Sequence, residues 1–260
     1  RVAAIGGSDL HQRVPDPGTD DEVGRLAATM NDMLARLEAS AGRQAQFVSD
    51  ASHELRSPLA SIRTQLEVAI AHPETADWGV VAGGVLEEGR RMERLVDDLL
   101  TSERAASGNL TIKSSEISLL DECQEIVHSS IFDAEVAVTG ANVTTHADSL
   151  RTRQIIRNLI TNAVRYGGET ILVEVSSEDL ATVTVKDDGP GVKHLDVERI
   201  FDPYYRSQDG HSSVDSVGLG LAVARQLARL MGGDIVYRRV EGWTHFELSL
   251  PLASEPAKVS

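Results

Sequence analysis

Apolar residues recur at steps of three and four along two long stretches in the first 106 residues. The first stretch begins at Val23 and resumes over residues 48–69, and the second runs from about Ala76 to Arg104. Spacing of this kind predicts two amphipathic helices. The dipeptide at 72–73, His-Pro, ends the first helix, because proline lacks the amide that a continuing helix uses.

Residues 1–20 lack this periodicity and contain several glycines and prolines, which is typical of a connector. The two helices that follow form a hairpin whose apolar stripes are too long to cover each other. Pairing of two copies into a four-helix bundle would bury these stripes. We therefore expect a homodimer.

After a polar break at 105–109, short β-branched runs alternate with helical stretches. The predicted strands are 171–175, 181–185, 234–237 and 245–250, and the predicted helices are 118–130, 149–166 and 219–231. This order favours an α+β domain, in which helices cover one sheet. The fold class predicted for the whole chain is therefore α followed by α+β, with a loose tail at the end.

Charge and cysteine content narrow the classes of partner. Lys and Arg number 25 and Asp and Glu number 40, so the formal net charge of the 260 residues is −15. A general nucleic-acid binder needs a positive surface, so no nucleic acid is an expected partner. The single cysteine, Cys123, cannot form an intramolecular disulfide, and no Cys/His cluster has zinc-ligand spacing. These features are typical of a reducing compartment, and no run reaches the roughly 18–20 apolar residues of a membrane helix.

A histidine in the first predicted helix is a candidate nucleophile. With Val48 and Leu55 at the a positions of a heptad, His53 falls at f, which faces away from the helix seam. A neutral imidazole can attack phosphorus, and Glu54 beside it can accept the other ring proton. Ser57 follows one helical turn later. An isolated exposed histidine usually has no chemical role, so the surrounding residues have to carry the argument.

The helix predicted over 149–166 carries a candidate phosphate and metal site. Asn158 and Asn162 lie at i and i+4 on one face, opposite a row of isoleucine and leucine. Two aligned amides can bind a hydrated Mg²⁺ ion and phosphate oxygens, and Arg165 adds a positive charge. Two asparagines taken alone are better explained as a solvated polar face.

Two glycine-containing segments complete the set of motifs. DDGPGV at 187–192 follows a predicted strand, and Asp187 offers a carboxylate to an exocyclic amine while the glycines admit a ligand. GLGLAVARQLARL at 218–230 opens an amphipathic helix whose free amides suit a polyphosphate, although it is not a P-loop. FDPYYR at 201–206 begins a candidate flap. Core filling is the alternative explanation for Phe201, Tyr204 and Tyr205, and we expect it to hold for at least one of them.

The order of these motifs resembles a known family. SDASHELRSPLASI at 49–62 resembles the phosphoacceptor box of sensor histidine kinases. The asparagine helix, DDGPGV, FDPYYR and GLGL resemble the ATP-binding domain that histidine kinases share with the Hsp90 chaperone, type II topoisomerases and the MutL mismatch-repair proteins. Within that group, only the histidine kinases carry an HELRSPL hairpin upstream. VPDPGTDDEVGRLAATMNDML also looks like the second half of a HAMP signalling module.

The resemblance implies a domain order and an activity. It assigns 1–40 to the C-terminal part of a HAMP domain, 41–106 to dimerisation and histidine phosphotransfer, 107–253 to a GHKL-type α/β sandwich that binds ATP, and 254–260 to a flexible tail. The implied activity is that of a protein-histidine kinase of a two-component system. It autophosphorylates from Mg²⁺-ATP and passes the phosphoryl group to an aspartate of a response regulator. The implied full-length protein is embedded in the inner or cell membrane through segments before Arg1, which leaves this portion in the cytoplasm.

The resemblance also assigns residues. His53 is the phosphorylated residue, Glu54 is its acid/base partner, and Ser57 is a third catalytic position that bears on phosphatase activity. Asn162 is the Mg²⁺ ligand, and Asp187 reads the adenine amine. The residues assigned to ATP are Asn158, Asn162, Arg165, Tyr166, Asp187, Gly189, Gly191, Gly218, Leu219 and Gly220.

Two other functions remain open at this point. One is a catalytically quiet dimeric scaffold or nucleotide sensor, against which the intact Glu54, Asn162 and Asp187 argue. The other is an enzyme that acts mainly as a phosphatase of its regulator, for which the identity of residue 57 matters.

Overall fold

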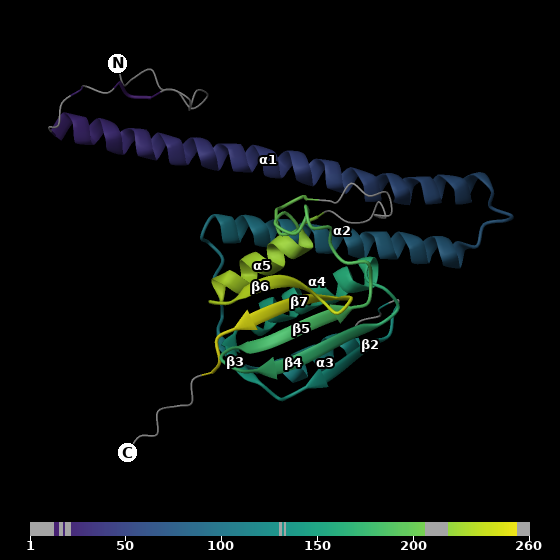
Figure 1. Cartoon of the computed structure of the whole chain (residues 1–260). Helices are drawn as coiled ribbons and strands as arrows, with labels where there is room; N and C mark the ends of the chain where they lie inside the picture. Colours follow the sequence, from purple (N-terminus) through teal and green to yellow (C-terminus); the bar gives the residue numbers. More distant parts are fainter. Residues whose placement is uncertain are drawn as a thin grey trace. The chain divides into compact units, whose positions relative to one another are not determined.

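The computed structural model describes residues 13–15, 18, 22–129, 132, 134–205 and 218–253. The chain divides into two compact units, Arg1–Glu93 and Arg94–Ser260. Figure 1 follows the chain through both.

The first unit contains one long helix and the beginning of a second. Helix α1 spans Glu22–Ala71 and runs through Pro58, and α2 spans Trp78–Ala106. Asp77 caps α2, because its Oδ1 accepts hydrogen bonds from the amides of Gly79 at 2.9 Å and Val80 at 3.2 Å. The two predicted helices are therefore confirmed, and the predicted break at 72–73 lies in the turn between them.

A short piece of the N-terminal connector is fixed to α1. The Oδ1 atom of Asn31 accepts a hydrogen bond from the Val14 amide at 2.8 Å, and its Nδ2 donates to the Val14 carbonyl at 3.0 Å. One side chain thus satisfies both backbone groups of Val14, and Arg13 next to it forms an ion pair with Glu38.

Most large apolar side chains of the first unit are exposed. Among its described residues, the buried apolar side chains belong to Ala27, Pro58 and Ala69, whereas Val23, Met33 and Leu59 are each about three-fifths exposed. Single helices bury such stripes only against another surface. No helix in the described ranges is long and apolar enough to cross a membrane.

The second unit contains a five-stranded sheet in the order β2-β4-β5-β7-β6. These strands are β2 (Val136–Gly140), β4 (Ile171–Ser177), β5 (Ala181–Asp187), β6 (Asp234–Val240) and β7 (Trp243–Leu250). All neighbours pair antiparallel except β2 and β4. A separate antiparallel pair joins β1 (Ser115–Ser118) to β3 (Thr144–Ala147).

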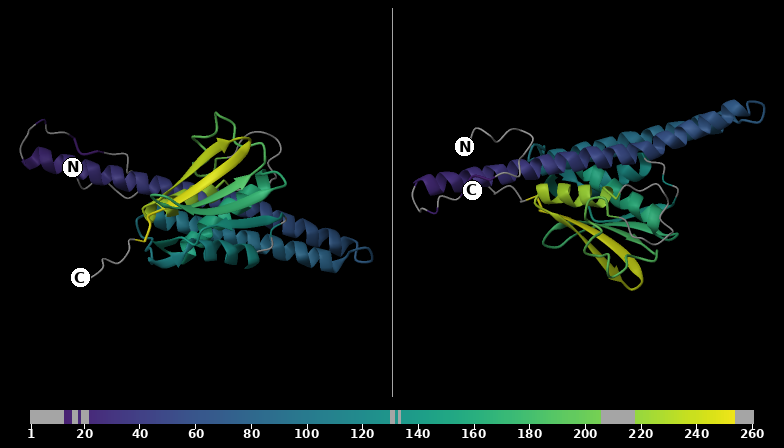
Figure 2. Two further views of the ribbon diagram at one scale, coloured as in Figure 1. Left: turned by 60° about the horizontal axis from the view of Figure 1, so that its bottom comes forward. Right: turned by 90° about the horizontal axis from the view of Figure 1, so that it is seen from above.

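Three helices cover one face of this sheet, as Figures 1 and 2 show. They are α3 (Leu119–Ser129), α4 (Ser149–Tyr166) and α5 (Gly220–Leu230). Alternate residues of the central strands point into the core between the layers, and Val183, Phe246 and Leu248 are at most 1% exposed there. The predicted α+β sandwich is confirmed.

The predicted helices and strands of this unit are all present, but three strands were not predicted. β1 and β3 have four residues each, and β2 has five, three of them exposed. Short runs of this kind carry little alternation in the sequence. Their pairing depends on distant partners, because β2 pairs with β4 across more than 30 intervening residues.

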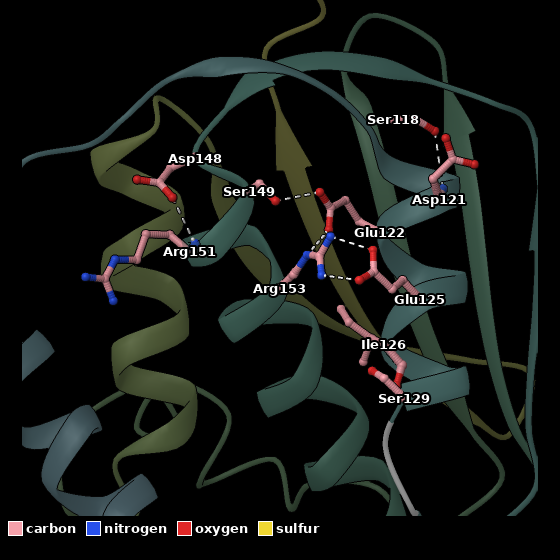
Figure 3. Close-up of polar contacts among 10 residues, drawn as sticks. All are labelled: Ser118, Asp121, Glu122, Glu125, Ile126, Ser129, Asp148, Ser149, Arg151 and Arg153. Atoms are coloured by element: carbon pink, nitrogen blue, oxygen red, sulfur yellow. Dashed lines mark hydrogen bonds and ion pairs between the residues drawn. The ribbon is translucent and has the colours of Figure 1, made fainter.

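Helices α3 and α4 are joined by a charged network that Figure 3 shows. Arg153 of α4 donates to Glu122, and to both carboxylate oxygens of Glu125 at 2.7 and 2.6 Å. Ser149 donates to the other oxygen of Glu122 at 2.7 Å. The Glu122 side chain is only 9% exposed, so Arg153 compensates a nearly buried charge. This network fixes the start of the helix that carries the two asparagines.

Candidate nucleotide site

Helix α4 presents the two predicted asparagines. Asp148 caps its first turn by accepting a hydrogen bond from the Arg151 amide at 3.2 Å, and Gly167 follows its last residue. The apolar residues on the core side, Ile155, Ile156, Leu159 and Ile160, are fully buried. Asn158 and Asn162 are half-buried on the other side of the helix.

Asn158 links α4 to the start of α5. Its Nδ2 donates to the Gly220 carbonyl at 3.1 Å, and a Cβ atom on Gly220 would lie 3.7 Å from the Asn158 amide group. The amide nitrogen of Asn158 therefore orients the GLGL segment, while its oxygen faces a different direction and can accept a ligand. Leu219, just before the helix, is buried and anchors this end of α5.

Asp187 ends β5 and begins the glycine-containing turn. The residue is 3% exposed, and its carboxylate accepts a hydrogen bond from the Gly189 amide at 3.1 Å. A Cβ atom on Gly189 would lie 2.6 Å from the Cα of Gly167, and a Cβ atom on Gly167 would lie 2.8 Å from the Asp187 Cβ. The turn and the end of α4 therefore pack backbone against backbone, and only glycine fits there.

Arg165 and Tyr166 lie at this same end of α4, and both are exposed. The structure thus brings together three of the predicted motifs: the asparagine helix, the turn after β5 and the start of α5. Asn158 and Gly220 are 62 positions apart in the sequence, and the motif order alone did not establish that these segments meet.

Burial raises the pKa of Asp187, and three groups oppose that shift. The Gly189 amide, the Thr244 hydroxyl and the positive charge of Arg239 each lower this pKa, in that order. Thr244 and Arg239 were not among the predicted site residues. Thr244 directly precedes a predicted strand, and Arg239 follows another, so their alignment with Asp187 depends on strand register that the sequence does not display.

Gly218 closes the base of the predicted flap. It has a φ of +72°, and its carbonyl accepts a hydrogen bond from the Tyr204 amide at 3.1 Å. Phe201 packs edge-on against Phe246, with 6.5 Å between ring centroids, and Arg225 stacks over it at 4.5 Å. Phe201 is half-buried and contacts the core residue Phe246, which agrees with the expectation that at least one of the three aromatic residues packs against the core. The rest of the flap, residues 206–217, lies outside the described residues.

The donor groups of this site suit a magnesium nucleotide. Asn158 and Asn162 offer hard oxygen ligands, and α5 starts without a hydrogen bond from a capping side chain, which leaves its first amides to an anion. Within the described ranges, no cluster of three or more His, Cys, Asp or Glu could hold a metal ion by itself. A magnesium ion here would therefore take amide, phosphate and water oxygens.

The predicted phosphoacceptor lies in α1, in the first unit. The backbone at His53 and Glu54 is helical, but their side chains lie outside the described residues. Ser57 is exposed one turn further on, and Pro58 is buried.

Three family models match successive parts of the chain. Residues 147–254 match the histidine kinase-, DNA gyrase B- and HSP90-like ATPase, residues 43–108 match the His Kinase A (phospho-acceptor) domain, and residues 1–39 match the HAMP domain. The chain belongs to the sensor histidine kinases.

Curated sensor kinases align with nearly the whole chain. The sensor protein CutS of Streptomyces coelicolor is 35% identical over 250 residues, which cover 92% of this chain and 60% of CutS. The sensor protein QseC of Escherichia coli is 35% identical over 247 residues, which cover 89% of this chain and 54% of QseC. This histidine kinase chain therefore spans about three-fifths or less of the length of these relatives.

Solved histidine kinase structures share the fold. The histidine kinase AdeS of Acinetobacter baumannii matches with a TM-score of 0.58 and 21% identity, over 78% of this chain and 98% of AdeS. Full-length ShkA in complex with AMPPNP matches with a TM-score of 0.55 and 23% identity, over 82% of this chain and 47% of ShkA.

Proposed function

We propose that this chain transfers the γ-phosphoryl group of ATP to His53 and then to an aspartate of a response regulator. The observation that carries the proposal is the meeting of Asn158, the Asp187 turn and the start of α5, since these groups together can hold a nucleobase and a polyphosphate. The match of residues 43–108 to a phospho-acceptor domain supports His53 as the acceptor in this proposal.

The roles of the nucleotide-binding residues follow from their chemistry. The Asp187 carboxylate accepts a hydrogen bond from the adenine amine, and Gly189 and Gly191 let the base approach the backbone. The first amides of α5, after Gly218 and Leu219, bind phosphate oxygens. Bound Mg²⁺ neutralises phosphate charge, and Asn162 is the residue that we assign to it.

The remaining assigned residues act on the nucleotide at the end of α4 or at the phosphoacceptor histidine. Arg165 and Tyr166 line the nucleotide at the end of α4. A ring nitrogen of His53 forms a bond to the γ-phosphorus as the bond from phosphorus to the bridging oxygen of ADP breaks. Glu54 accepts the proton of the other ring nitrogen, which keeps the attacking nitrogen nucleophilic.

The working protein in this proposal is a homodimer anchored at a membrane, with this portion in the cytoplasm. The exposed stripe of α1, including Leu26, Met33 and Leu59, gives a second copy an apolar surface to cover. The HAMP match over residues 1–39 and the sensor proteins among the relatives support the anchored arrangement.

Phosphate transfer to His53 is tested by incubation with γ-labelled ATP and Mg²⁺. We expect the wild type to retain a label that acid removes and base does not, and His53→Gln to remain unlabelled. His72→Gln is the matched control, because this exposed histidine lies in the turn after α1, outside the phosphoacceptor motif. Undiminished labelling of His53→Gln would contradict the assignment.

Dephosphorylation of the regulator is a second activity of the same helix. Ser57 is exposed one turn after His53, where a side chain can reach a docked receiver domain. With a receiver domain phosphorylated by acetyl phosphate, we expect Ser57→Ala to slow the decay of the phosphoaspartate. An unchanged decay rate would remove Ser57 from this role.

A further inference from the structure

Residues 196–205 form a turn that lies in the sequence between the glycine-containing turn and α5. The amides of Arg199 and Ile200 donate to the Asp196 carbonyl at 2.8 and 3.0 Å, so the first half of the turn is wound by its own backbone. Its middle is anchored through Phe201, which contacts both the sheet and α5. The position of the last residues of the turn depends on further contacts.

The end of this turn lies directly against the residue that leads into α5. The Tyr204 amide donates to the Gly218 carbonyl at 3.1 Å. A Cβ atom on Gly218 would lie 2.6 Å from the Tyr205 carbonyl oxygen and 2.9 Å from the carbonyl carbon of Tyr204, so the two backbones touch. Gly220 begins α5 only two residues after Gly218. The placement of the end of the turn therefore sets the placement of the first amides of α5.

Tyr204 holds an unfavourable backbone conformation at this contact. Its φ is +64°, in the left-handed region that a bulky side chain disfavours. Among the described residues that carry a side chain, Glu241 alone shares a positive φ, and it lies in the two-residue hairpin between β6 and β7, where this conformation is ordinary. A strained residue persists only where its surroundings enforce the strain. Tyr204 therefore depends on neighbouring contacts to stay in place.

Tyr205 supplies these contacts through its side chain. Its hydroxyl donates to Oδ1 of Asp196 at 2.5 Å, and the guanidinium carbon of Arg199 lies 4.3 Å from the centre of its ring. A hydrogen bond from a hydroxyl to a carboxylate is charge-assisted and about twice as strong as a neutral one. The stack with Arg199 is the weaker contact, because the Arg199 side chain is 63% exposed. Asp196 is therefore the main attachment for the end of the turn.

We infer that Asp196 is a positioning residue for the phosphates of the bound nucleotide. It acts through the Tyr205 hydroxyl, which holds the end of the turn against Gly218 and thereby places the first amides of α5. The inference rests on the proposed function, in which those amides bind phosphate oxygens. A hydrogen bond weakens steeply as its donor turns away from the acceptor, so a small displacement of this helix start weakens the phosphate contacts. The nucleobase site at Asp187 belongs to β5 and should not respond.

The test compares a ligand that has phosphates with one that lacks them. The affinity for Mg²⁺-ADP is measured by calorimetry, and the affinity for adenosine by nuclear magnetic resonance titration. We expect Asp196→Ala and Tyr205→Phe each to weaken Mg²⁺-ADP about three- to tenfold, since part of one charge-assisted hydrogen bond is transmitted to the phosphates. Adenosine should stay within about twofold of the wild type. The ratio of the two dissociation constants isolates the contribution of the phosphates, which a general loss of folding would not change.

Three further variants separate positioning from charge. Glu198→Ala is the matched control, because it removes an exposed carboxylate from the same turn and should leave the ratio unchanged. Asp196→Asn keeps an oxygen that can accept from Tyr205 and should recover most of the ratio. The double change Asp196→Ala and Tyr205→Phe should weaken Mg²⁺-ADP no more than either single change, because both remove the same bond. Additive losses, or equal weakening of Mg²⁺-ADP and adenosine, would overturn the inference.

The wild type distinguishes a failure of this inference from a failure of the proposed function. If the wild type binds Mg²⁺-ADP no more tightly than adenosine, the assignment of the start of α5 to the phosphates is wrong, and the inference fails with it. If the wild type binds Mg²⁺-ADP more tightly, and both Asp196→Ala and Tyr205→Phe keep the full difference, only the positioning role of Asp196 is wrong.

Discussion

The two units of this histidine kinase bury their apolar side chains in different ways. In Arg94–Ser260, the side chains of Leu159, Val183 and Leu248 are completely shielded from solvent. In Arg1–Glu93, Val23 is 60% exposed and Leu59 is 59% exposed. The second unit therefore completes its core within one chain, whereas the helical unit leaves an apolar surface that the proposed dimer would cover.

The two tryptophans allow this comparison to be measured in the intact chain. Trp78 belongs to the helical unit and Trp243 to the nucleotide-binding unit. In a Trp78→Phe background, fluorescence reports the unfolding of the second unit. In a Trp243→Phe background, fluorescence reports the unfolding of the first unit.

The largest effect is expected for the core beneath the nucleotide site. Leu159→Ala removes a fully buried side chain from α4 and should lower the free energy of unfolding of the second unit by about 2–5 kcal/mol. Urea titration followed through Trp243 measures this change. The control is Leu180→Ala, since Leu180 is 43% exposed and its truncation should have little effect. A loss below about 1 kcal/mol for Leu159→Ala would mean that this core is not tightly packed.

The charged network between α3 and α4 should have the next largest effect. Arg153→Met leaves the nearly buried Glu122 without its cation and should cost about 2–3 kcal/mol in the same urea titration. The exposed Arg157→Met is the control. The double change Glu122→Met and Arg153→Met should recover part of the loss, because the charge left without Arg153 is then that of Glu125, whose side chain is 58% exposed. A double variant as unstable as Arg153→Met would point to lost packing instead.

The helical unit should respond through its association. Leu59→Glu places a charge on the exposed apolar stripe of α1 and should raise the dissociation constant of the dimer at least about tenfold, which is ~1.4 kcal/mol. Analytical ultracentrifugation measures the constant. Thr64→Glu adds the same charge at another exposed position of α1 and should leave it unchanged. If Leu59→Glu dimerises like the wild type, Leu59 lies outside the interface.

A smaller, pH-dependent effect is expected at Asp234. Hydrogen bonds from Arg225 at 2.7 and 3.0 Å, aided by Arg229, hold the pKa of Asp234 far below its usual value. A lowered pKa in the folded state stabilises the fold above the unfolded pKa of about 4, and this contribution is lost as the pH falls. After allowance for solvent screening, Asp234→Asn should cost about 1 kcal/mol at pH 7 and progressively less below pH 4. Thermal unfolding at pH 7 and pH 3 tests this, and an equal difference at both values would contradict it.

The smallest expected effect is a gain in stability. Thr152 is completely buried, and its hydroxyl has no hydrogen-bond partner among the described residues. Thr152→Val should therefore stabilise the second unit by about 0.5–1 kcal/mol in urea titration. Thr145→Val is the matched contrast, because the buried hydroxyl of Thr145 donates to the Pro251 carbonyl at 2.6 Å. Removal of this hydroxyl should lower the free energy of unfolding of the second unit. A loss of stability in Thr152→Val would show that its hydroxyl is satisfied in solution.

How far the sequence predicts this molecule depends on whether a feature is local. The bounds of α4 were predicted correctly because Asp148 before it and Gly167 after it are local signals, and its apolar spacing is strong. The β2 strand was missed because its stability comes from parallel pairing with β4. The candidate site shows the same division. Asp187 was found through its own motif, but Thr244 and Arg239 were not, because strand register aligns them.

The two hydrogen bonds between Asn31 and Val14 bear on how the connector is held on α1. A single side chain satisfies both the N–H and the C=O of Val14, so a shift of the connector at this point would have to break both bonds together. Asn31 therefore holds the register of the connector at Val14 as one unit.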